Sequence, residues 1–514
     1  MRTCVSILLV LTAACTANTF DTTKDDAGNP INPVNGGDGG TGGDGAVAPG
    51  AEAVYVSSSK GSATGDGSKT HPFASLEAAI AKAGSLPVYA CAETYAEQVH
   101  FVAGTNVYGY YECNTWTKTT AHAKIVSPLS PTAIATGISM STTVEAVDIV
   151  APDFTDKSQS SIALFATSSP ALTIKNATIH AGTGGKGHDG TAGVQLTDTS
   201  AKNGSDAWAD GICTGSACTF YLGSKTLQPA GGTSTCVGET GHDPGPGGEG
   251  GNPGEFQSVQ FGLNNWIWNA VNNDNTGAGL PSTPTSQTAQ GGSVGIGGSN
   301  GAAGANGKDG QSGLDFGTIT SNGTYAPSEG TTGTAGNPGQ GGGGSGGYNA
   351  LASDYSASTY KSYYAWGEPG AGGGAGGCPG LPGMAGRGGG ASFAVVAMGA
   401  GLTLDTVTIE SSKGGDGGAS GIPSAPTAGG FGGHTGGHVN GAGNGGAGGN
   451  AGVSGNGGGG PSLGIAYDKV KPTMLASTVK QGAGGSGVAV RTVNGQTIPA
   501  SDAGMSSDVY MFGQ

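Results

Sequence analysis

The sequence predicts an all-β protein, a parallel β-helix interrupted by long glycine-rich excursions. Two observations lead to this expectation: a pair of short alternating strands recurs along the chain, and glycine recurs at every third position between the copies. Of the 514 residues, 107 are Gly and 25 are Pro, while 35% are hydrophobic and 11% are charged. This composition is too poor in apolar residues for one large core and too weakly charged for disorder by self-repulsion. A long, thin molecule with a narrow core fits both facts.

The repeated strand pair is the more direct signal because it is internal to the chain. Residues 161–179 contain two alternating apolar runs, residues 392–409 repeat them, and residues 462–479 are a weaker third copy. The second and third copies are offset by 70 residues throughout. One such unit cannot bury its apolar side alone, so we expect the units to stack in parallel.

Glycine triplets fill the stretches around these copies. In residues 292–313, eight of nine glycines fall in one frame of three. Shorter runs occupy 36–45, 184–193, 245–254, 330–342, 377–389 and 443–458. A flexible linker needs glycine but no frame, and collagen needs three chains and abundant Pro, which the 292–313 run lacks. We expect extended helices of three residues per turn, bundled within one chain with glycine facing glycine; a disordered spacer is the alternative.

The N-terminus has the pattern of an export signal. Arg2 precedes an apolar run, and Leu11-Thr12-Ala13-Ala14-Cys15 resembles the lipobox of bacterial lipoproteins. The resemblance implies removal of residues 1–14 and acylation of Cys15, which anchors the chain to a membrane. A plain secretory signal is the alternative. Thr16 follows the cysteine, which by the enterobacterial sorting rule indicates the outer membrane, and no later segment has the ~20 apolar residues that span a bilayer.

Composition shifts also predict the domain boundaries. The expected parts are a tether at 15–50, a capping helix with β-helix coils at 51–183, further coils at 391–413 and 462–514, and glycine-rich excursions at 184–390 and 414–461. Within the first coils, Ser75 is expected to cap a short helix that ends at Gly84. This helix is expected to bury Leu76, Ile80 and Ala83 on one face.

The beginning of the ordered region is similar to bacterial extracellular members of the pectate-lyase-like superfamily. The matching residues are the strand Val54-Tyr55-Val56, the turn Gly65-Asp66-Gly67, the helix start Pro72-Phe73-Ala74-Ser75-Leu76 and the strand Tyr95-Ala96-Glu97-Gln98-Val99. The resemblance implies a right-handed parallel β-helix whose open end is plugged by the helix. The domain in these members has no assigned function. The glycine-rich part resembles bacterial surface proteins with Gly-Gly-x repeats.

Six cysteines follow the expected cleavage site: Cys91, Cys113, Cys213, Cys218, Cys236 and Cys378. An exported protein permits disulfides. Cys91 and Cys113 are 22 residues apart, about one coil, and stacked coils lie about 4.8 Å apart. We therefore expect a Cys91–Cys113 bridge. The similar spacing of Cys213 and Cys236 predicts a second bridge, which leaves Cys218 to pair with Cys378; a local Cys213–Cys218 bridge is the alternative.

The sequence gives little reason to expect catalysis, a cofactor or a metal. Gly-x-Ser-x-Gly occurs at 291–295, 297–301 and 343–347, outside the strand–turn–helix context of a nucleophile elbow. Asp148, Asp153 and Asp156 are interpreted as a solvated turn, with no histidine or arginine expected near them. The segment 184–189 matches the start of a calcium-binding repeat, and His434 and His438 have a zinc-like spacing; we interpret both as solvated loops.

Charge and aromatic content limit the classes of partner that the protein could bind. A net charge of −15 disfavours nucleic acid, because phosphate binding needs clustered Lys and Arg. Aromatic residues concentrate at 256–268 and 355–366, where they either bind a ligand or pin a loop to the scaffold. The sequence therefore predicts a lipid-anchored surface protein with a structural or adhesive role and a polysaccharide or another surface protein as partner. A polysaccharide lyase or hydrolase and a calcium-dependent assembly protein are the alternatives.

Overall fold

The part of the chain that the structure describes is nearly all β, with very little helix. The computed structural model describes residues 52–512 except 156, 199–201, 208–210, 215–216, 221–228, 252–254, 261–265, 273–295, 315, 348–368 and 436–440. For the strands within 211–220, 255–260 and 266–272, only the backbone is described. Every described residue belongs to one compact unit, which spans residues 45–514.

The helix α1 (Leu76–Ala83) begins and ends where the sequence predicts. The hydroxyl of Ser75 accepts a hydrogen bond from the backbone N–H of Ala78, and Gly84 follows the last turn with a positive φ. Leu76, Ile80 and Ala83 are buried, as is Ala79. The capping hydroxyl, an apolar stripe and a terminal glycine are sufficient local signals for a short helix.

Parallel strands follow in three rows. The first row is β1 (Val54–Val56), β2 (Val88–Cys91), β5 (Val107–Tyr111), β8 (Thr142–Glu145), β11 (Leu172–His180), β21 (Thr403–Glu410) and β23 (Thr473–Leu475). The second is β3 (Thr94–Tyr95), β6 (Ala123–Val126), β9 (Val147–Val150), the second halves of β11 and β21, and β24 (Thr478–Lys480). The third is β4 (Val99–Phe101), β7 (Ala133–Thr136), β10 (Ser161–Thr167), β20 (Ser392–Met398), β22 (Ser462–Tyr467) and β27 (Ser506–Met511).

Rows one and two form a single curled sheet because β11 and β21 each pair with both rows. At the bend, the four residues that follow one another from strand to strand all have a positive φ: Ala146, Asn176, Thr406 and Ala476. Inside the curl lies a core of Val, Ile, Leu and Ala side chains, many of them fully buried. Each large aliphatic side chain contributes about 1.5–3 kcal/mol through this burial.

The strand repeat predicted from the sequence sets the register of the stack. Ser161 pairs with Ser392 and Ser392 with Ser462, while Thr173 pairs with Thr403 and Thr403 with Thr473. The expected parallel stacking of the three copies is therefore confirmed. Equivalent side chains face the same core in each copy, which explains why the alternation is repeated.

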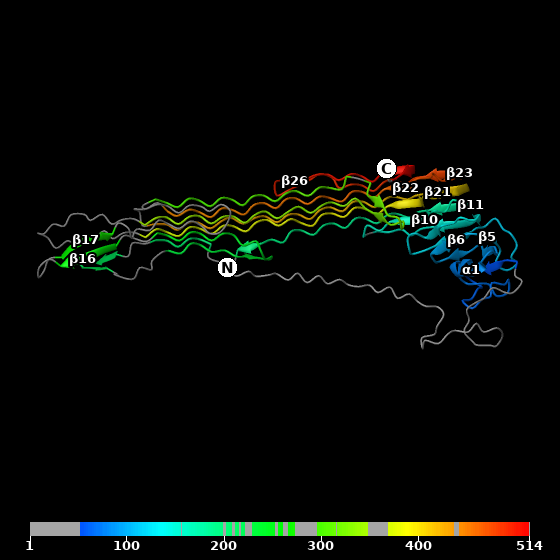
Figure 1. Ribbon diagram of the computed structural model, residues 1–514, viewed down its shortest axis with the longest axis horizontal. Coiled ribbons are helices and arrows are strands. Elements are labelled where there is room, and N and C mark those ends of the chain that lie inside the picture. Colours follow the sequence, from blue (N-terminus) through cyan, green and yellow to red (C-terminus); the bar gives the residue numbers. More distant parts are fainter. Residues whose placement is uncertain are drawn as a thin grey trace, which may run out of the picture. The chain divides into compact units, whose positions relative to one another are not determined.

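Glycine-rich segments leave the stack after β11, β21 and β24 and run alongside one another, as Figure 1 shows. The N–H groups of Gly301, Gly304, Gly307, Gly310 and Gly313 all donate to carbonyl groups within 444–456. The segment 328–343 is bonded to both of these segments, again at every third residue. A Cβ on Gly304 would lie 2.7 Å from the carbonyl carbon of Asn337 and 2.7 Å from the nitrogen of Gly449, so the frame of three is a steric requirement.

The residues between the glycines also have a role. The side-chain oxygens of Asn300, Asn306 and Asp309 accept hydrogen bonds from backbone N–H groups in the neighbouring segment, at Asn444, Asn450 and Val453. Asp189 bonds Ala419 in the same way. Short polar side chains thus accept hydrogen bonds from backbone N–H groups that are not bonded to a backbone carbonyl. This explains the Asn and Asp residues among the triplets.

Short pairs of antiparallel strands lie within the glycine-rich segments. They are β12 (Thr197–Asp198) with β15 (Cys236–Val237), β13 (Gly211–Thr214) with β14 (Ala217–Phe220), β16 (Glu255–Gln260) with β17 (Trp266–Asn272), β18 (Thr318–Ile319) with β19 (Tyr325–Ala326), and β25 (Arg491–Val493) with β26 (Gln496–Ile498).

Candidate functional site

A row of tyrosines crosses the outer surface of the first strands. Tyr55, Tyr89 and Tyr108 are aligned in register on β1, β2 and β5. Each lies between buried neighbours and is itself half-buried, so the rings point away from the core. Neighbouring ring centroids are 5.6 Å and 5.9 Å apart, edge to face. The signal in the sequence was the alternation of Tyr with Val in three successive strands, which sequence reasoning used only to place the strands.

Three more aromatic residues pack around this row, and one of them, Tyr111, is itself buried. Tyr111 stacks on Tyr89 with centroids 4.5 Å apart, Trp116 packs against Tyr55 at 4.8 Å, and Tyr110 lies 5.1 Å from Tyr111. The aromatic face is defined here as these six residues: Tyr55, Tyr89, Tyr108, Tyr110, Tyr111 and Trp116. The rings pack on one another, so their positions are fixed by contacts within the protein.

Two lysines border the aromatic face. The ammonium of Lys69 lies 5.4 Å from the ring centroid of Tyr55, and that of Lys118 lies 4.6 Å from the ring centroid of Tyr110. The hydrogen bond to Tyr110 raises the pKa of Lys118, and burial raises the pKa of Tyr108. The aromatic face therefore combines apolar rings and hydroxyl groups with two cations at its border, and Glu145 on β8 lies in register with Tyr108.

A groove lies where the excursions leave the stack. Its volume is about 290 Å³, and its walls include Phe154 and the side chains of Lys186, Lys413 and Asp416. Lys186 pairs with Asp189 and Lys413 pairs with Asp416, so both cations are already neutralised. Asp153, also in the wall, accepts the backbone N–H of Thr183 at 2.7 Å. The charged side chains that line the groove are therefore paired within the protein.

His180 lies between two potential catalytic partners. Its Nδ1 is 3.5 Å from Oε2 of Glu410, and its Nε2 is 3.4 Å from the hydroxyl of Ser412. This is the order of groups that activates a serine nucleophile. However, the N–H of Ser412 is donated to the hydroxyl of Ser392, so it does not serve as an oxyanion donor. The group links neighbouring strands rather than forming a complete catalytic constellation.

Within the predicted carboxylate cluster, Asp153 is exposed outside the strands, as expected for a solvated turn, whereas Asp148 has a different environment. Asp148 lies in β9, where its Oδ1 is 3.1 Å from Nδ1 of His122 and accepts the N–H of Thr178 at 2.7 Å. The expectation that no histidine lies near these carboxylates is therefore wrong, because stacking brings β6 and its preceding residue beside β9. Asp148 and Asp153 each bond a backbone N–H about 30 residues further along the chain. Asp156 lies outside the described residues.

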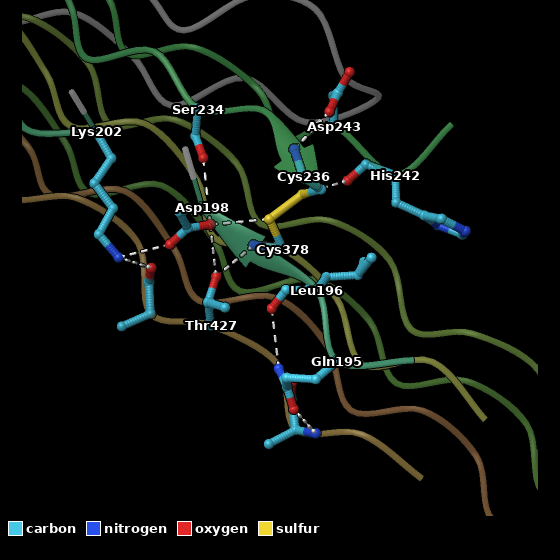
Figure 2. Close-up of a disulfide and its surroundings, with 12 residues drawn as sticks. Gln195, Leu196, Asp198, Lys202, Ser234, Cys236, His242, Asp243, Cys378 and Thr427 are labelled. Atoms are coloured by element: carbon cyan, nitrogen blue, oxygen red, sulfur yellow. Dashed lines mark hydrogen bonds and ion pairs between the residues drawn. A yellow bond between two sulfur atoms is a disulfide. The ribbon is translucent and has the colours of Figure 1, made fainter. Parts of the chain in front are cut away.

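A disulfide joins Cys236 and Cys378, with an S–S distance of 2.06 Å (Figure 2). Beside it, the half-buried Asp198 accepts hydrogen bonds from Lys202, Ser234 and Thr427, as Figure 2 also shows. The carboxylate and the disulfide together connect several glycine-rich segments. The site is a structural clamp, since the carboxylate oxygens are occupied by donors from the protein.

The expected cysteine pairing is corrected by this bond. Because Cys236 is bonded to Cys378, neither a Cys213–Cys236 nor a Cys218–Cys378 bridge is formed. The spacing argument assumed that the excursion is built of regular coils, whereas residues 230–251 and 369–391 are glycine-rich segments brought together by the bundle. Cys213 and Cys218 lie opposite each other in the backbone register of β13 and β14, and their side chains lie outside the description.

Cys91 and Cys113 are free thiols in the structure, so the expected bridge between them is not present either. The register explains the difference. A bulge after Tyr89 aligns Cys91 with Tyr111, and Cys113 comes two residues after the end of β5. The spacing of 22 residues therefore does not match the register, which aligns Cys91 with Tyr111 at this point.

The other predicted sites can be placed only in part. In the calcium-like segment, Asp189 is occupied by Lys186 and by the N–H of Ala419. His434 pairs with Asp206 at 3.5 Å, whereas His438, the lipidation site Cys15, residues 1–50 and the aromatic side chains at 256–268 and 355–366 lie outside the description.

Comparison of the chain with protein-family models, curated proteins and solved structures found no match. Within the described residues, no helix is both long and apolar enough to cross a membrane.

Proposed function

We propose that this chain is a lipid-anchored surface protein that binds an extracellular glycan through its aromatic face. In this proposal Cys15 carries the anchor and the outer membrane is the location, as the lipobox-like N-terminus suggests. The strand rows form a right-handed β-helix, and the glycine-rich segments are extended helices of three residues per turn. The aromatic face is the observation on which the adhesive function depends.

The aromatic face suits a sugar because of its mixed chemistry. A pyranose ring has apolar C–H patches edged by hydroxyl groups, and tyrosine offers an apolar ring with a hydroxyl at its rim. Tyr55, Tyr89 and Tyr108 repeat at intervals of 5.6 and 5.9 Å, so a linear polymer lying across the strands meets one ring after another. Lys69 and Lys118 favour acidic sugars, in a protein that carries 35 acidic and 20 basic residues in all.

The glycine-rich segments support a structural part of the same function. Their backbones are hydrogen-bonded to neighbours at every third residue, and side chains close the remaining donors. At about 3.1 Å per residue, the segment 441–460 spans about 60 Å. Such a bundle holds a long surface extension straight without a wide apolar core.

The test is retention on immobilised glycans. The wild-type protein from residue 45 onward, a Tyr89→Ala/Tyr108→Ala variant and a Phe431→Ala control are passed over acidic and neutral polysaccharides, while the flow-through is assayed for chain cleavage. Phe431 is an aromatic residue with 67% exposure on a glycine-rich segment, so its loss tests for general stickiness. The two tyrosines are half-buried, and circular dichroism must show that the double variant keeps the β signal.

We expect wild type and Phe431→Ala to be retained on acidic glycan and the double variant to lose most retention. Retention should weaken as salt rises, because exposed charges are screened. Equal retention of all three proteins would remove the aromatic face as the binding site. Cleavage of glycan would point to an enzyme instead, and binding only with added calcium would point to calcium-dependent assembly.

A further inference from the structure

The two free thiols lie together with a carboxylate. The Sγ atoms of Cys91 and Cys113 and a carboxylate oxygen of Glu93 all lie within 4.8 Å of one another. Cys91 is the last residue of β2 and Glu93 comes two residues later, while Cys113 comes two residues after the end of β5. We propose that these three side chains bind a thiophilic divalent cation such as Zn²⁺. This site is independent of the aromatic face and of the proposed glycan binding.

The distances suit one tetrahedral ion. Zn–S bonds of about 2.3 Å and Zn–O bonds of about 2.0 Å place the ligand atoms of one tetrahedron roughly 3.5–3.8 Å apart. The observed cluster therefore needs side-chain movements of about 1 Å or less. Two thiolates and one carboxylate supply three ligands, and water supplies the fourth, as in zinc sites that keep one open position.

The surroundings orient the ligands. Cys91 is fully buried, whereas Cys113 and Glu93 are half-buried, so an ion enters from the side of Cys113. The backbone N–H of Ser59 donates to Oε1 of Glu93, and the hydroxyl of Tyr95 donates to the carbonyl of Cys91. These bonds hold a carboxylate and a main-chain segment beside the thiols, as outer partners do in metal sites.

The chemistry of binding follows from the ligand types. A cysteine binds a cation as its thiolate, so each of the two thiols gives up its proton when the ion binds.

The experiment measures zinc binding by the protein from residue 45 onward, purified without oxygen and without added reductant. Reductant is omitted because opening Cys236–Cys378 would create a second dithiol beside Asp198. Zinc is titrated against a chromophoric chelator for wild type, Cys113→Ser, Glu93→Gln and Glu112→Gln. Glu112 is the matched control, since its carboxylate adjoins Cys113 in sequence but is bonded to Asn114 and Thr115. Alkylation with iodoacetamide, with and without zinc, counts the accessible thiols.

We expect one zinc ion per wild-type chain, no binding by Cys113→Ser, and affinity lowered at least tenfold in Glu93→Gln but unchanged in Glu112→Gln. Zinc should also protect the Cys113 thiol from alkylation. The proposal is overturned if Cys113→Ser binds zinc as wild type does, or if wild type with free thiols binds none. It is equally overturned if denatured, unreduced wild type shows that Cys91 and Cys113 are joined as a disulfide.

Discussion

Adding one methyl group to Gly304 tests the packing of the glycine-rich segments. A Cβ at this position would lie 2.7 Å from the carbonyl carbon of Asn337 and 2.7 Å from the nitrogen of Gly449, and closer still to the Asn337 oxygen. Carbon atoms pack at about 3.5–4.0 Å. In the Gly304→Ala variant the backbones must therefore separate by about 1 Å.

The free-energy cost follows from the bonds that this separation strains. The N–H of Asn337 donates to Ala305 at 2.8 Å, and the carbonyl of Asn337 accepts from Gly449 at 2.8 Å. Losing two hydrogen bonds costs about 2 kcal/mol, and overpacking adds about 1–3 kcal/mol. The lower backbone entropy of unfolded alanine returns about 0.4–1 kcal/mol. The net loss of local stability is about 3 kcal/mol.

Hydrogen exchange measured by mass spectrometry is the suitable assay, because it reports stability segment by segment. A loss of about 3 kcal/mol speeds exchange of the amides in 328–343 and 444–456, which contain the N–H groups of Asn337 and Gly449, by more than about a hundredfold. The control is Gly441→Ala, which adds the same methyl at the end of a glycine run, where the nearest described atom, the carbonyl oxygen of Gly433, is 3.3 Å away. Its exchange should stay close to that of wild type.

The reasoning is refuted if Gly304→Ala and Gly441→Ala exchange at the same rate in these segments. Such a result would mean that the frame of three does not arise from contact between backbones. A uniform increase over the whole chain in both variants would lead to the same conclusion.

Three further predictions follow from other features. Cys378→Ser removes the bond to Cys236, which spans 142 residues. The variant should lose about 4 kcal/mol of stability and unfold at a lower Tm in calorimetry. An unchanged Tm would contradict the role of this site as a clamp. Thr406→Asn should raise stability by about 1 kcal/mol in urea unfolding, because the exposed, β-branched Thr406 has a φ of 56°, whereas a loss would show that the threonine side chain matters more than the backbone. The N–H groups of Thr115 and Asn114 lower the pKa of Glu112 from 4.5 to about 2. Its stabilisation is thus complete above about pH 4.5 and is lost as the pH falls towards 2, so Glu112→Gln should flatten Tm against pH in that window, and an identical slope would count against it.

Local features were predictable because their causes are local. Ser75, Gly84 and the apolar spacing between them define α1 within ten residues of sequence. The alternation in residues 161–179 and its copies predicted the parallel register, since each strand must turn the same side chains to the core. The frame of three predicted that glycines face a neighbouring backbone, and a Cβ on most of them would meet one.

The candidate sites were harder to predict because they combine residues distant in sequence. Tyr55, Tyr89 and Tyr108 become one surface only when β1, β2 and β5 pair in register. His122 meets Asp148 only through the pairing of β6 with β9. Neither grouping leaves a spacing signal in the chain.

By itself, the sequence determined the features whose causes lie in nearby residues: the capped helix, the alternation within the strands and the glycine frame. Only the tertiary structure decided which segments lie together. Cys236 bonds Cys378 and not Cys213 because hydrogen bonds between glycine-rich segments bring those two parts of the chain to one place. Backbone hydrogen bonds between glycines are nearly the same for every pair of segments, so the choice of partners depends on the whole bundle and is not encoded in any single run.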